Sequence, residues 1–557
     1  MFAQLDTRTV YSFMDSLVDL KTYVSKSKSL GYQTIGILDH SNLYAAYHFI
    51  QEAQKANLRP IVGFSFDIVV ENRSIEVYCI AINTVGYKNL LKLSTAQMSE
   101  KMSLNLLTEH LEGVQLILPY QDVLDQLNLP FDYVIGVNLT SPQIPYTKPI
   151  IAIDTVRYFQ KNDIETLQML HAIRDNVLLK DAQYASKNQE LKPCQEMTLA
   201  FKERFPEALA NLESLVENVA YHFDSDFKLP IFNREIPAGE ELRTLTQNNL
   251  KSKGLWSDAY QERLEKELTI IHKMGFDDYF LIVWDLLRFG RSKGYYMGMG
   301  RGSAAGSLVS YALNITGIDP VKHNLIFERF LNEERYSMPD IDIDLPDIYR
   351  GEFLRYVRNR YGSMHSAQIV TFSTFGAKQA IRDVFKRFGA SEYELTNITK
   401  KIHFRDNLTS VYNRNLAFRQ IIDSKIEYQK AYDIAKRIEG NPRQTSIHAA
   451  GVVMSDDLLT DHIPLKNGED MMITQYDASS VEDNGLLKMD FLGLRNLTFV
   501  QKMKEKVDKD YGISIQLETI DLEDKETLKL FAAGQTKGIF QFEQSCDVLG
   551  QSVLKMW

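Results

Sequence analysis

Short apolar runs alternate with amphipathic stretches along the first 160 residues of the chain. The runs at residues 34–40 and 59–70 are apolar and rich in β-branched residues, which predicts buried strands. The stretches 17–32 and 42–56 repeat apolar residues at helical spacing. Further strands are expected at residues 75–83, 114–120, 132–139 and 148–156. Because strands alternate with helices, this segment predicts parallel βα units that could close into a barrel.

The pattern changes in the rest of the chain. Residues 194–224 become helical, and a stretch rich in Pro and Gly at 229–241 marks a domain boundary. Long helical stretches are predicted at 240–293 and, with many charges, at 347–440. Strand patterns return at residues 448–455, 471–477 and 486–494. A return to strands after helices indicates an insertion into a split domain.

Composition describes a folded chain of more than one domain. Its 557 residues exceed the usual size of a domain, and its hydrophobic fraction of 44% is that of folded proteins. The three cysteines, Cys79, Cys194 and Cys546, are far apart, which argues against disulfides and a zinc ribbon. No apolar run approaches the ~18 residues of a membrane span, and the N-terminus lacks a signal-peptide pattern. We therefore expect a cytoplasmic protein without a membrane segment.

The net charge of −10 has the wrong sign for a simple nucleic-acid binder, although it does not exclude a local basic channel. Basic residues concentrate in one region, at Arg355, Arg358, Arg360, Lys378, Arg382, Lys386, Arg387, Lys400, Lys401 and Arg405. Taken alone, this pattern favours solvated helix faces over a nucleic-acid surface.

Carboxylates alternate with aliphatic residues between two prolines at residues 339–346. In a strand, Asp340, Asp342 and Asp344 would share one face, about 6.5–7 Å apart. Carboxylates at this spacing repel one another unless water or cations separate them, and Mg²⁺ or Mn²⁺ prefers such oxygen ligands. The spacing fails for an EF-hand calcium loop, because the sixth and twelfth positions from Asp340 are not Gly and Glu. An acidic surface strand is the other interpretation.

A glycine-rich loop at residues 298–307 precedes an apolar helical segment. Glycines let backbone amides approach an anion, and the following helix N-terminus, which Ser303 could cap, attracts phosphate. Arg301 adds a planar donor that suits phosphate oxygens. We therefore predict that Gly300, Arg301, Gly302 and Ser303 bind phosphate, although a tight turn would explain the glycines equally well.

The same loop formally fits a dinucleotide-binding fingerprint, since Gly300, Gly302 and Ala305 have the required spacing and Asp319 follows. That interpretation needs a strand immediately before the loop, where the sequence predicts a helix end and a polar turn. A P-loop motif is absent. A dinucleotide-dependent enzyme is thus a remote alternative.

A third carboxylate is expected from the predicted strand at 486–494. Lys488 and Asp490 would share one face there, so that Asp490 could complete a metal cage while Lys488 contacts phosphate. A structural salt bridge is the alternative for this pair. Together with the loop and the aspartate strand, these residues predict nucleotidyl transfer, in which divalent ions activate a 3′-hydroxyl and hold the phosphates.

These motifs together resemble the C-family replicative polymerases, the α subunits of bacterial DNA polymerase III. The resemblance rests on GMGRGSAAGSLVSYALNITGIDP, FERFLNEERYSMPDIDIDLPD, HAAGVVMS, and ITQYD followed by GLLKMDFLGLRNLT. It implies an α/β multidomain chain with a PHP-like βα barrel, a polymerase β-like nucleotidyltransferase palm split by a helical thumb, and the start of the fingers. The implied ranges are 1–225 for the PHP-like domain, 226–370 and 447–500 for the palm, 371–446 for the thumb, and 501–545 for the fingers.

The resemblance also implies site residues, cofactors and partners. The catalytic and metal-binding aspartates correspond to Asp342, Asp344 and Asp490, which would hold two Mg²⁺ ions, with Asp340 as a neighbour. The phosphate-binding motif corresponds to Gly302 and Ser303, and Lys488 matches a motif lysine. The implied substrates are primer-template DNA and deoxynucleoside triphosphates (dNTPs). The implied partners are replisome subunits such as the sliding clamp, helicase and loader, although the clamp site is not expected in this sequence.

The PHP-like segment departs from the family's metal-binding pattern. The ligand positions are occupied here by Asp6, Arg8, Ser65, Glu76, Thr155 and Arg157, while Asp15, Asp39 and His40 remain. Arginine offers no lone pair to a metal and adds positive charge. We therefore expect a structural domain without bound metal or exonuclease activity.

The end of the chain is the second departure. Residues 546–557 do not continue the family's fingers, as in a frameshift product or a fragment. We therefore expect the isolated chain to polymerise poorly or not at all. A noncatalytic binding or regulatory module that keeps the fold is the alternative to an active polymerase.

Overall fold

The chain divides into two compact units, each built from two segments. Unit 1 comprises residues 1–228 and 358–488, and unit 2 comprises residues 229–357 and 489–557. The computed structural model describes residues 1–100, 102–183, 185–222, 226, 228–333, 339–515, 520–521 and 523–539. The off-family tail expected at 546–557 lies outside the described residues.

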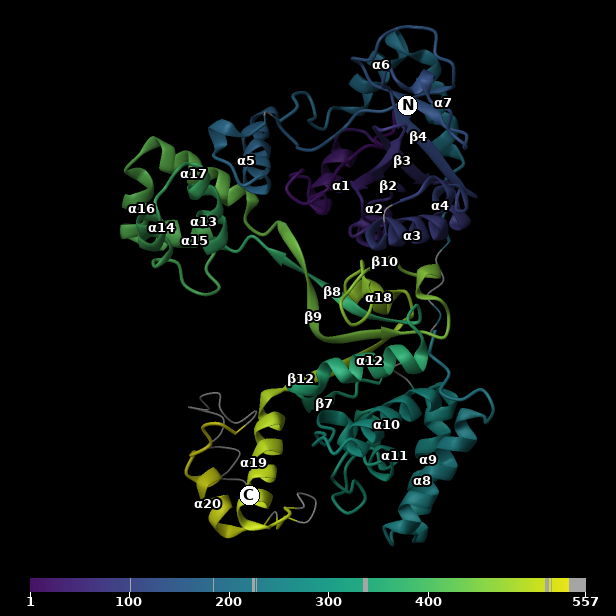
Figure 1. Cartoon of the computed structure of the whole chain (residues 1–557), viewed down its shortest axis with the longest axis vertical. Coiled ribbons are helices and arrows are strands. Elements are labelled where there is room, and N and C mark those ends of the chain that lie inside the picture. The colour runs from purple at the N-terminus through teal and green to yellow at the C-terminus, as the bar shows by residue number, and fades with distance from the viewer. Residues whose placement is uncertain are drawn as a thin grey trace. The chain divides into compact units, whose positions relative to one another are not determined.

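A six-stranded sheet forms the centre of the N-terminal part of unit 1 (Figure 1). Its strands follow sequence order: β1 (Thr34–His40), β2 (Arg59–Val70), β3 (Arg73–Ala81), β4 (Val114–Pro119), β5 (Val134–Val137) and β6 (Ile150–Ala152). The β2–β3 and β3–β4 pairs are antiparallel and the others parallel, so the predicted parallel pairing holds for only part of the sheet. Glu71 and Asn72 explain this, because their positive φ angles of 50° and 64° make the two-residue turn of a hairpin.

The N-terminal segment draws the two edges of this sheet together. Gln4 forms a parallel bridge with Ile35 of β1, and Thr7 forms one with Val156, which follows β6. The helices that share one apolar core with the strands include α1 (Leu20–Ser29), α2 (Ala46–Lys55), α3 (Thr84–Ser99), α6 (Cys194–Arg204) and α7 (Pro206–Glu217). A short helix, α4 (Leu104–Thr108), follows α3. The curled sheet agrees with the predicted barrel architecture.

A helical group with its own apolar core forms another part of unit 1. Its members are α5 (Ile164–Arg174), α13 (Ala377–Arg387), α14 (Glu392–Thr399), α15 (Leu408–Arg414), α16 (Leu416–Asp423) and α17 (Ile426–Ile438). Helices α13–α17 are inserted between the antiparallel strands β8 (Ser366–Thr374) and β9 (Pro442–Met454). This agrees with the predicted helical insertion, although β8 falls within a stretch expected to be helical. The unit also contains β10 (Leu465–Lys466), β11 (Ile473–Thr474) and α18 (Ala478–Asp483).

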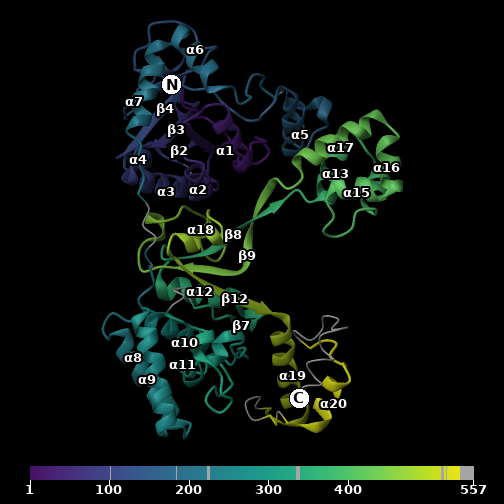
Figure 2. The same cartoon turned by 180° about the vertical axis from the view of Figure 1, so that it is seen from behind.

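Unit 2 combines helices with a short pair of strands (Figure 2). Its first helices are α8 (Ala238–Ser252), α9 (Asp258–Lys273) and α10 (Asp277–Ser292). They divide the predicted helical stretch because Gly254 and Gly275, with φ of 71° and 74°, end α8 and α9. The remaining helices are α11 (Leu308–Ala312), α12 (Arg350–Tyr361), which runs on into unit 1, α19 (Arg495–Tyr511) and α20 (Lys525–Ala532).

The strands of unit 2 bring distant segments of the chain together. β7 (Ile343–Pro346) pairs in parallel with β12 (Leu487–Leu494), and Ile343 stands opposite Phe491. Burial alternates along β12, where Leu487, Met489 and Phe491 are buried. This alternation confirms that Lys488 and Asp490 share the other face. Among the described residues, no helix is both long and apolar enough to cross a membrane.

Candidate active site

Three carboxylates of unit 2 gather beside the paired strands. One oxygen from each of Asp340, Asp342 and Asp490 lies within 4.8 Å of the other two. Asp490 belongs to β12 and the other two precede β7, so the parallel pairing of these strands brings them together. Carboxylate oxygens at this separation fit a divalent cation such as Mg²⁺ or Mn²⁺.

Asp344 lies outside this group, which differs from the prediction that Asp344 completes it and Asp340 stands beside it. The side chain of Asp344 is only 7% exposed, and its Oδ2 accepts a hydrogen bond from Nε of Arg301 at 3.0 Å. Gly298 packs against Asp344, since its amide donates to the Asp344 carbonyl at 2.9 Å and a Cβ at 298 would lie 2.6 Å from the Asp344 Cβ. The loop therefore covers one end of the aspartate face.

Arg301 joins the glycine-rich loop to the aspartates. Its Nη2 lies 2.9 Å from Oδ2 of Asp342, while its Nε bonds Asp344. Burial raises the pKa of Asp342; Arg301 opposes this shift, and the neighbouring carboxylates add to it. A divalent cation would offset the same repulsion that the guanidinium offsets here.

Tyr279 supports the segment that precedes β7. This buried α10 residue accepts a hydrogen bond at its hydroxyl from the Ile341 amide, at 2.9 Å. Burial raises the pKa of Tyr279, and the nearby aspartates raise it further, so the hydroxyl stays protonated. The sequence gives no signal for this role, because the contact joins positions 62 residues apart.

The glycine-rich loop is irregular and does not start a long helix. Residues Gly302–Gly306 form a short 3₁₀ turn, and Ser307, instead of Ser303, caps α11 by accepting a bond from the Ser310 amide. Gly302 has a φ of 71°, a conformation that favours glycine, and Gly302 and Ser303 are exposed. The backbone of the loop is thus open to a ligand, but the predicted cap was wrong.

A buried glutamate of α9 occupies the N-terminus of α11. Glu267 accepts hydrogen bonds from the amides of Leu308 and Val309, at 2.9 and 3.1 Å, and its charge is paired with Arg263 at 2.6 Å. The amides that were expected to bind phosphate are therefore already bonded to a protein carboxylate. Glu267 precedes Ser307 by 40 residues, so local spacing could not reveal this contact.

The segment before the glycine-rich loop tests the alternative that the loop binds a dinucleotide. α10 ends at Ser292, and the described residues 293–299 contain no strand. The fingerprint requires a strand that leads directly into the loop. The structure therefore lacks the context for dinucleotide binding.

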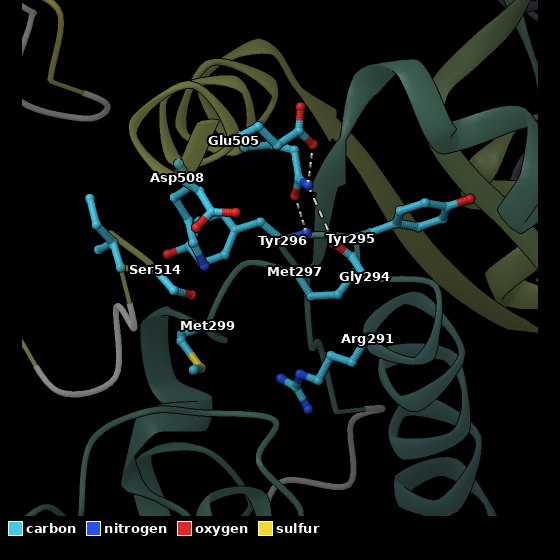
Figure 3. A pocket seen from close by; sticks show the side chains of 12 residues that line it. Arg291, Gly294, Tyr295, Tyr296, Met297, Met299, Glu505, Asp508 and Ser514 are labelled. Carbon is cyan, nitrogen blue, oxygen red and sulfur yellow. Dashed lines mark hydrogen bonds between the residues drawn. The ribbon is translucent and has the colours of Figure 1, made fainter. Parts of the chain in front are cut away.

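Helix α19 holds this segment in place (Figure 3). Gln501 accepts a hydrogen bond from the Tyr296 amide at 2.7 Å and donates to the Gly294 carbonyl at 3.3 Å. Its side-chain nitrogen also bonds Glu505 at 2.7 Å. A cavity of about 310 Å³ beside these contacts is lined by Tyr296 and Met299 among others. The loop position thus depends on the helix that follows β12.

Lys488 is the last residue of unit 1, two positions before Asp490 on β12. It is partly buried, and its Nζ lies 3.4 Å from an oxygen of Glu482. This ion pair agrees with the structural alternative for Lys488. It leaves the proposed contact with phosphate untested.

A second carboxylate cluster, in unit 1, contains a cation of its own. The Arg8 side chain is 2% exposed; its Nε donates to Asp6 at 3.1 Å and its Nη2 to Glu76 at 2.7 Å. The other polar partners of this network are Ser65, Tyr78 and Thr155. Five of the six residues at the positions expected for metal ligands, Asp6, Arg8, Ser65, Glu76 and Thr155, thus belong to one hydrogen-bonded network.

The charges of this cluster are strongly coupled. Burial would raise the pKa of Glu76, but a hydrogen bond with His40 and the charge of Arg8 outweigh it and lower the pKa to about 2. Arg157, at the sixth position expected for a metal ligand, pairs with Asp15. Oδ1 of Asp15 also lies 2.9 Å from Nε2 of His171.

Asp39, which keeps the residue type expected of a metal ligand, is also hydrogen-bonded within the protein. It accepts hydrogen bonds from the amide and hydroxyl of Thr9, both at 2.7 Å, and from Ser12 at 2.6 Å. Burial raises the pKa of Asp39, while these hydrogen bonds lower it. The remaining acidic positions are therefore occupied by protein donors.

Three family models match the sequence. They are the bacterial DNA polymerase III alpha NTPase domain over residues 240–493, the PHP domain over 4–131, and the bacterial DNA polymerase III alpha subunit finger domain over 496–548. Similar proteins, each called DNA polymerase III subunit alpha, come from Streptococcus pyogenes serotype M3, at 65% identity over 98% of this chain, and Bacillus subtilis strain 168, at 37% over 98%. The chain covers 53% of each of these relatives, about half their length.

Proposed function

Because the chain belongs to the family of bacterial DNA polymerase III alpha subunits, we propose that unit 2 carries the active centre of a DNA-directed DNA polymerase. The observation that carries this proposal is the grouping of Asp340, Asp342 and Asp490 within 4.8 Å. The reaction would join a dNTP to the 3′ end of a primer and release pyrophosphate.

The cofactors proposed are two Mg²⁺ ions. Bound at the aspartates, they would lower the pKa of the attacking 3′-hydroxyl and stabilise charge on the phosphates. Asp342 and Asp490 are ligands in both the sequence-based hypothesis and the structural cluster. For the third ligand, the cluster supports Asp340, whereas the resemblance supported Asp344. We assign Asp340 to the metal and give Asp344 the role of orienting Arg301.

The proposed phosphate contacts are Gly300, Arg301, Gly302, Ser303 and Lys488. Arg301 is held by Asp342 and Asp344, so its guanidinium must leave at least one of them to reach a triphosphate. A metal ion on Asp342 would favour that release, because it competes with Nη2 for the same carboxylate. The loop would thus become available to phosphate once metal is bound.

The metal set can be tested with Mn²⁺ alone, by electron paramagnetic resonance titration. We expect Asp342→Asn and Asp490→Asn to weaken Mn²⁺ binding about 100-fold or more, and Asp340→Asn about 10–100-fold. Asp344→Asn should change the affinity by less than about fivefold, since Asp344 lies outside the cluster and acts on it only through the partly exposed Arg301. Asp258→Asn, an exposed change on α9, is the matched control. The opposite order for positions 340 and 344 would return Asp344 to the metal set.

Primer extension tests the catalytic proposal. With the chain in excess over primer-template DNA, we expect slow extension that Asp342→Asn abolishes and Asp258→Asn preserves. Extension that persists in Asp342→Asn would exclude this centre as its source. The alternative is a noncatalytic binding module. That alternative predicts Mn²⁺ and DNA binding without any extension.

The PHP-like part of unit 1 is proposed to hold no metal and to have no exonuclease activity. The support is the Arg8 guanidinium, which already balances the charges of Asp6 and Glu76. Inductively coupled plasma analysis of the Asp342→Asn, Asp490→Asn double variant isolates this part of the chain. One tightly bound zinc or manganese ion per chain would contradict the proposal.

The partners proposed are primer-template DNA, dNTPs and other replisome subunits, in the cytoplasm of a bacterium. The clamp-binding region is expected in the part of the relatives that this chain does not match. Copurification with a sliding clamp would contradict that expectation.

A further inference from the structure

A cavity of about 460 Å³ lies in unit 1, between the loop at residues 138–149 and the junction of α6 with α7. It reaches Ile150, the first residue of β6. Because β1 and β6 run in the same direction, this is the opposite end of the sheet from His40, the last residue of β1. The volume lies within the range of roughly 300–1,000 Å³ that is usual for small-ligand sites.

Arg204, the last residue of α6, gives this cavity a positive charge that the protein satisfies only in part. Its Nη2 donates to the Ser141 carbonyl at 2.9 Å, whereas its Nε is buried without a hydrogen-bond partner. Among the described residues, no carboxylate pairs with this guanidinium and Nη1 forms no hydrogen bond. An oxyanion would supply the missing acceptor and counter-charge, because a guanidinium binds such groups with two parallel hydrogen bonds.

The contacts of Arg204 also fix the wall of the cavity. While its Nη2 holds Ser141, its own carbonyl accepts a hydrogen bond from the Gln143 side chain at 2.8 Å. Its Cζ lies 5.4 Å from the centre of the Phe205 ring. The loop is thus attached to the helix junction on both sides of the guanidinium.

Lys148 adds a second cation from the loop. Its Nζ lies 5.4 Å from the centre of the Tyr133 ring and 3.9 Å from an oxygen of Asp132, whose side chain is fully exposed. A long ion pair at the surface contributes little, because water screens it. The charge of Lys148 is therefore still available to an incoming anion.

Glu207 is the acid that lines the cavity. It is exposed, and in the part of the chain that the structure describes it pairs with neither Arg204 nor Lys148. Two cations and one carboxylate leave the lining with a net positive charge. The cavity therefore favours an anion over a neutral or cationic ligand.

Apolar surface adjoins these charges. Ile144 is 43% exposed, and Pro145 lines the cavity beside it. The ring of Tyr146 packs edge-on against Tyr120 at 5.5 Å, and its hydroxyl donates to the Pro142 carbonyl. Because its hydroxyl is already bonded, Tyr146 offers the cavity mainly its ring. A ligand that fits this lining has an anionic end and an apolar part.

We propose that this cavity binds a small organic anion, with its oxyanion group at Arg204, attracted also by Lys148, and its apolar part against Ile144 and Pro145. Phosphate monoesters and carboxylates both carry an oxyanion that fits a guanidinium. The proposal is independent of the proposed polymerase function, because its residues all belong to the N-terminal part of unit 1.

Isothermal titration calorimetry tests the proposal, in EDTA so that no metal-bound phosphate is measured. The probes are phenyl phosphate, phenylacetate, inorganic phosphate and acetate. We expect a phenyl compound to bind more tightly than the inorganic phosphate or acetate that shares its oxyanion. Tighter binding of phenyl phosphate would identify a phosphate monoester as the ligand class, and tighter binding of phenylacetate a carboxylate.

Three variants test the assigned contacts. Lys148→Met should weaken binding of the phenyl compound about twofold to fivefold. Arg204→Lys, which keeps the charge but loses the planar fork, should weaken it about fivefold or more. Glu207→Gln should instead tighten binding about twofold to fivefold, since it removes the opposing charge. A variant that fails to fold cannot produce this gain in affinity.

Lys26→Met is the matched control. The Nζ of Lys26 lies 4.7 Å from the centre of the Phe159 ring, as that of Lys148 lies over Tyr133, but Lys26 is outside the cavity. This variant should bind like the unaltered chain. The proposal is overturned if neither phenyl compound binds at millimolar concentration, or if Lys148→Met and Glu207→Gln bind it with unchanged affinity.

Discussion

In both carboxylate clusters of this chain an arginine offsets the repulsion between the carboxylates, but the two arginines differ in burial. Around Asp6 and Glu76 the cation is the Arg8 guanidinium, which is almost completely buried and fixed to the chain. In unit 2, Arg301 pairs with Asp342 at the edge of the cluster, and its side chain is 33% exposed. A group of carboxylates therefore does not by itself specify a metal site. The position and burial of the nearest arginine decide whether its guanidinium stays with the carboxylates or can be replaced by a metal ion.

The largest expected effect concerns the buried cation. Arg8→Ala would leave Asp6 and Glu76 without their counter-charge, which typically costs about 3–5 kcal/mol of folding free energy. Arg301→Ala should cost less than about 1 kcal/mol, because that pair is partly exposed. Urea unfolding, followed by circular dichroism, measures both. If both variants lost the same folding free energy, the two arginines would not differ in their contribution to stability.

The acid stability of unit 1 gives a second, smaller effect. The folded pKa of Glu76, about 2, lies below its ordinary value of 4.5, so its ionised form stabilises the fold. That contribution is present above pH 4.5 and is lost as the pH falls toward 2, by roughly 1–3 kcal/mol. Glu76→Gln should flatten the dependence of unfolding free energy on pH in this window. An unchanged slope would show that the pKa of Glu76 is not lowered in the folded chain.

The smallest effect is expected in unit 2, where a metal ion should be able to replace the Arg301 guanidinium at Asp342. Arg301→Ala removes a cation that competes for Asp342, so Mn²⁺ should bind about threefold to tenfold more tightly in the absence of nucleotide. Electron paramagnetic resonance titration measures this change, and Arg291→Ala serves as a control in the same unit. Weaker Mn²⁺ binding in Arg301→Ala would mean that Arg301 supports the metal instead of competing with it.

Local sequence patterns predicted the elements better than their pairing. The strands at 34–40 and 59–70 begin and end where expected, because apolar runs report burial directly. The antiparallel turn at Glu71 and Asn72 was missed, since this pair is not the Asn-Gly or Asp-Gly pair that marks a two-residue hairpin most strongly. Strand β8 was missed because charged neighbours on both sides suggested helices.

The candidate site shows the same limit. The sequence placed Asp490 on a strand, where the structure has it, whereas Asp342, also predicted on a strand, lies immediately before β7. It could not show that Gly298 covers Asp344 or that Glu267 fills the N-terminus of α11, since both contacts join segments about 40 residues apart or more. Such contacts depend on the tertiary structure, which the spacing of residues within one motif does not reveal.

The buried Arg8 also bears on how this lineage could change. Codons for arginine and histidine can differ by a single base, so a possible metal ligand is one mutational step away. That step first removes the cation that Asp6 and Glu76 depend on, and the loss is immediate, whereas a metal site needs several further substitutions. The first intermediate is thus a poorly folding chain. Natural selection would discard it before any new chemistry arose, so the buried arginine acts as an evolutionary ratchet.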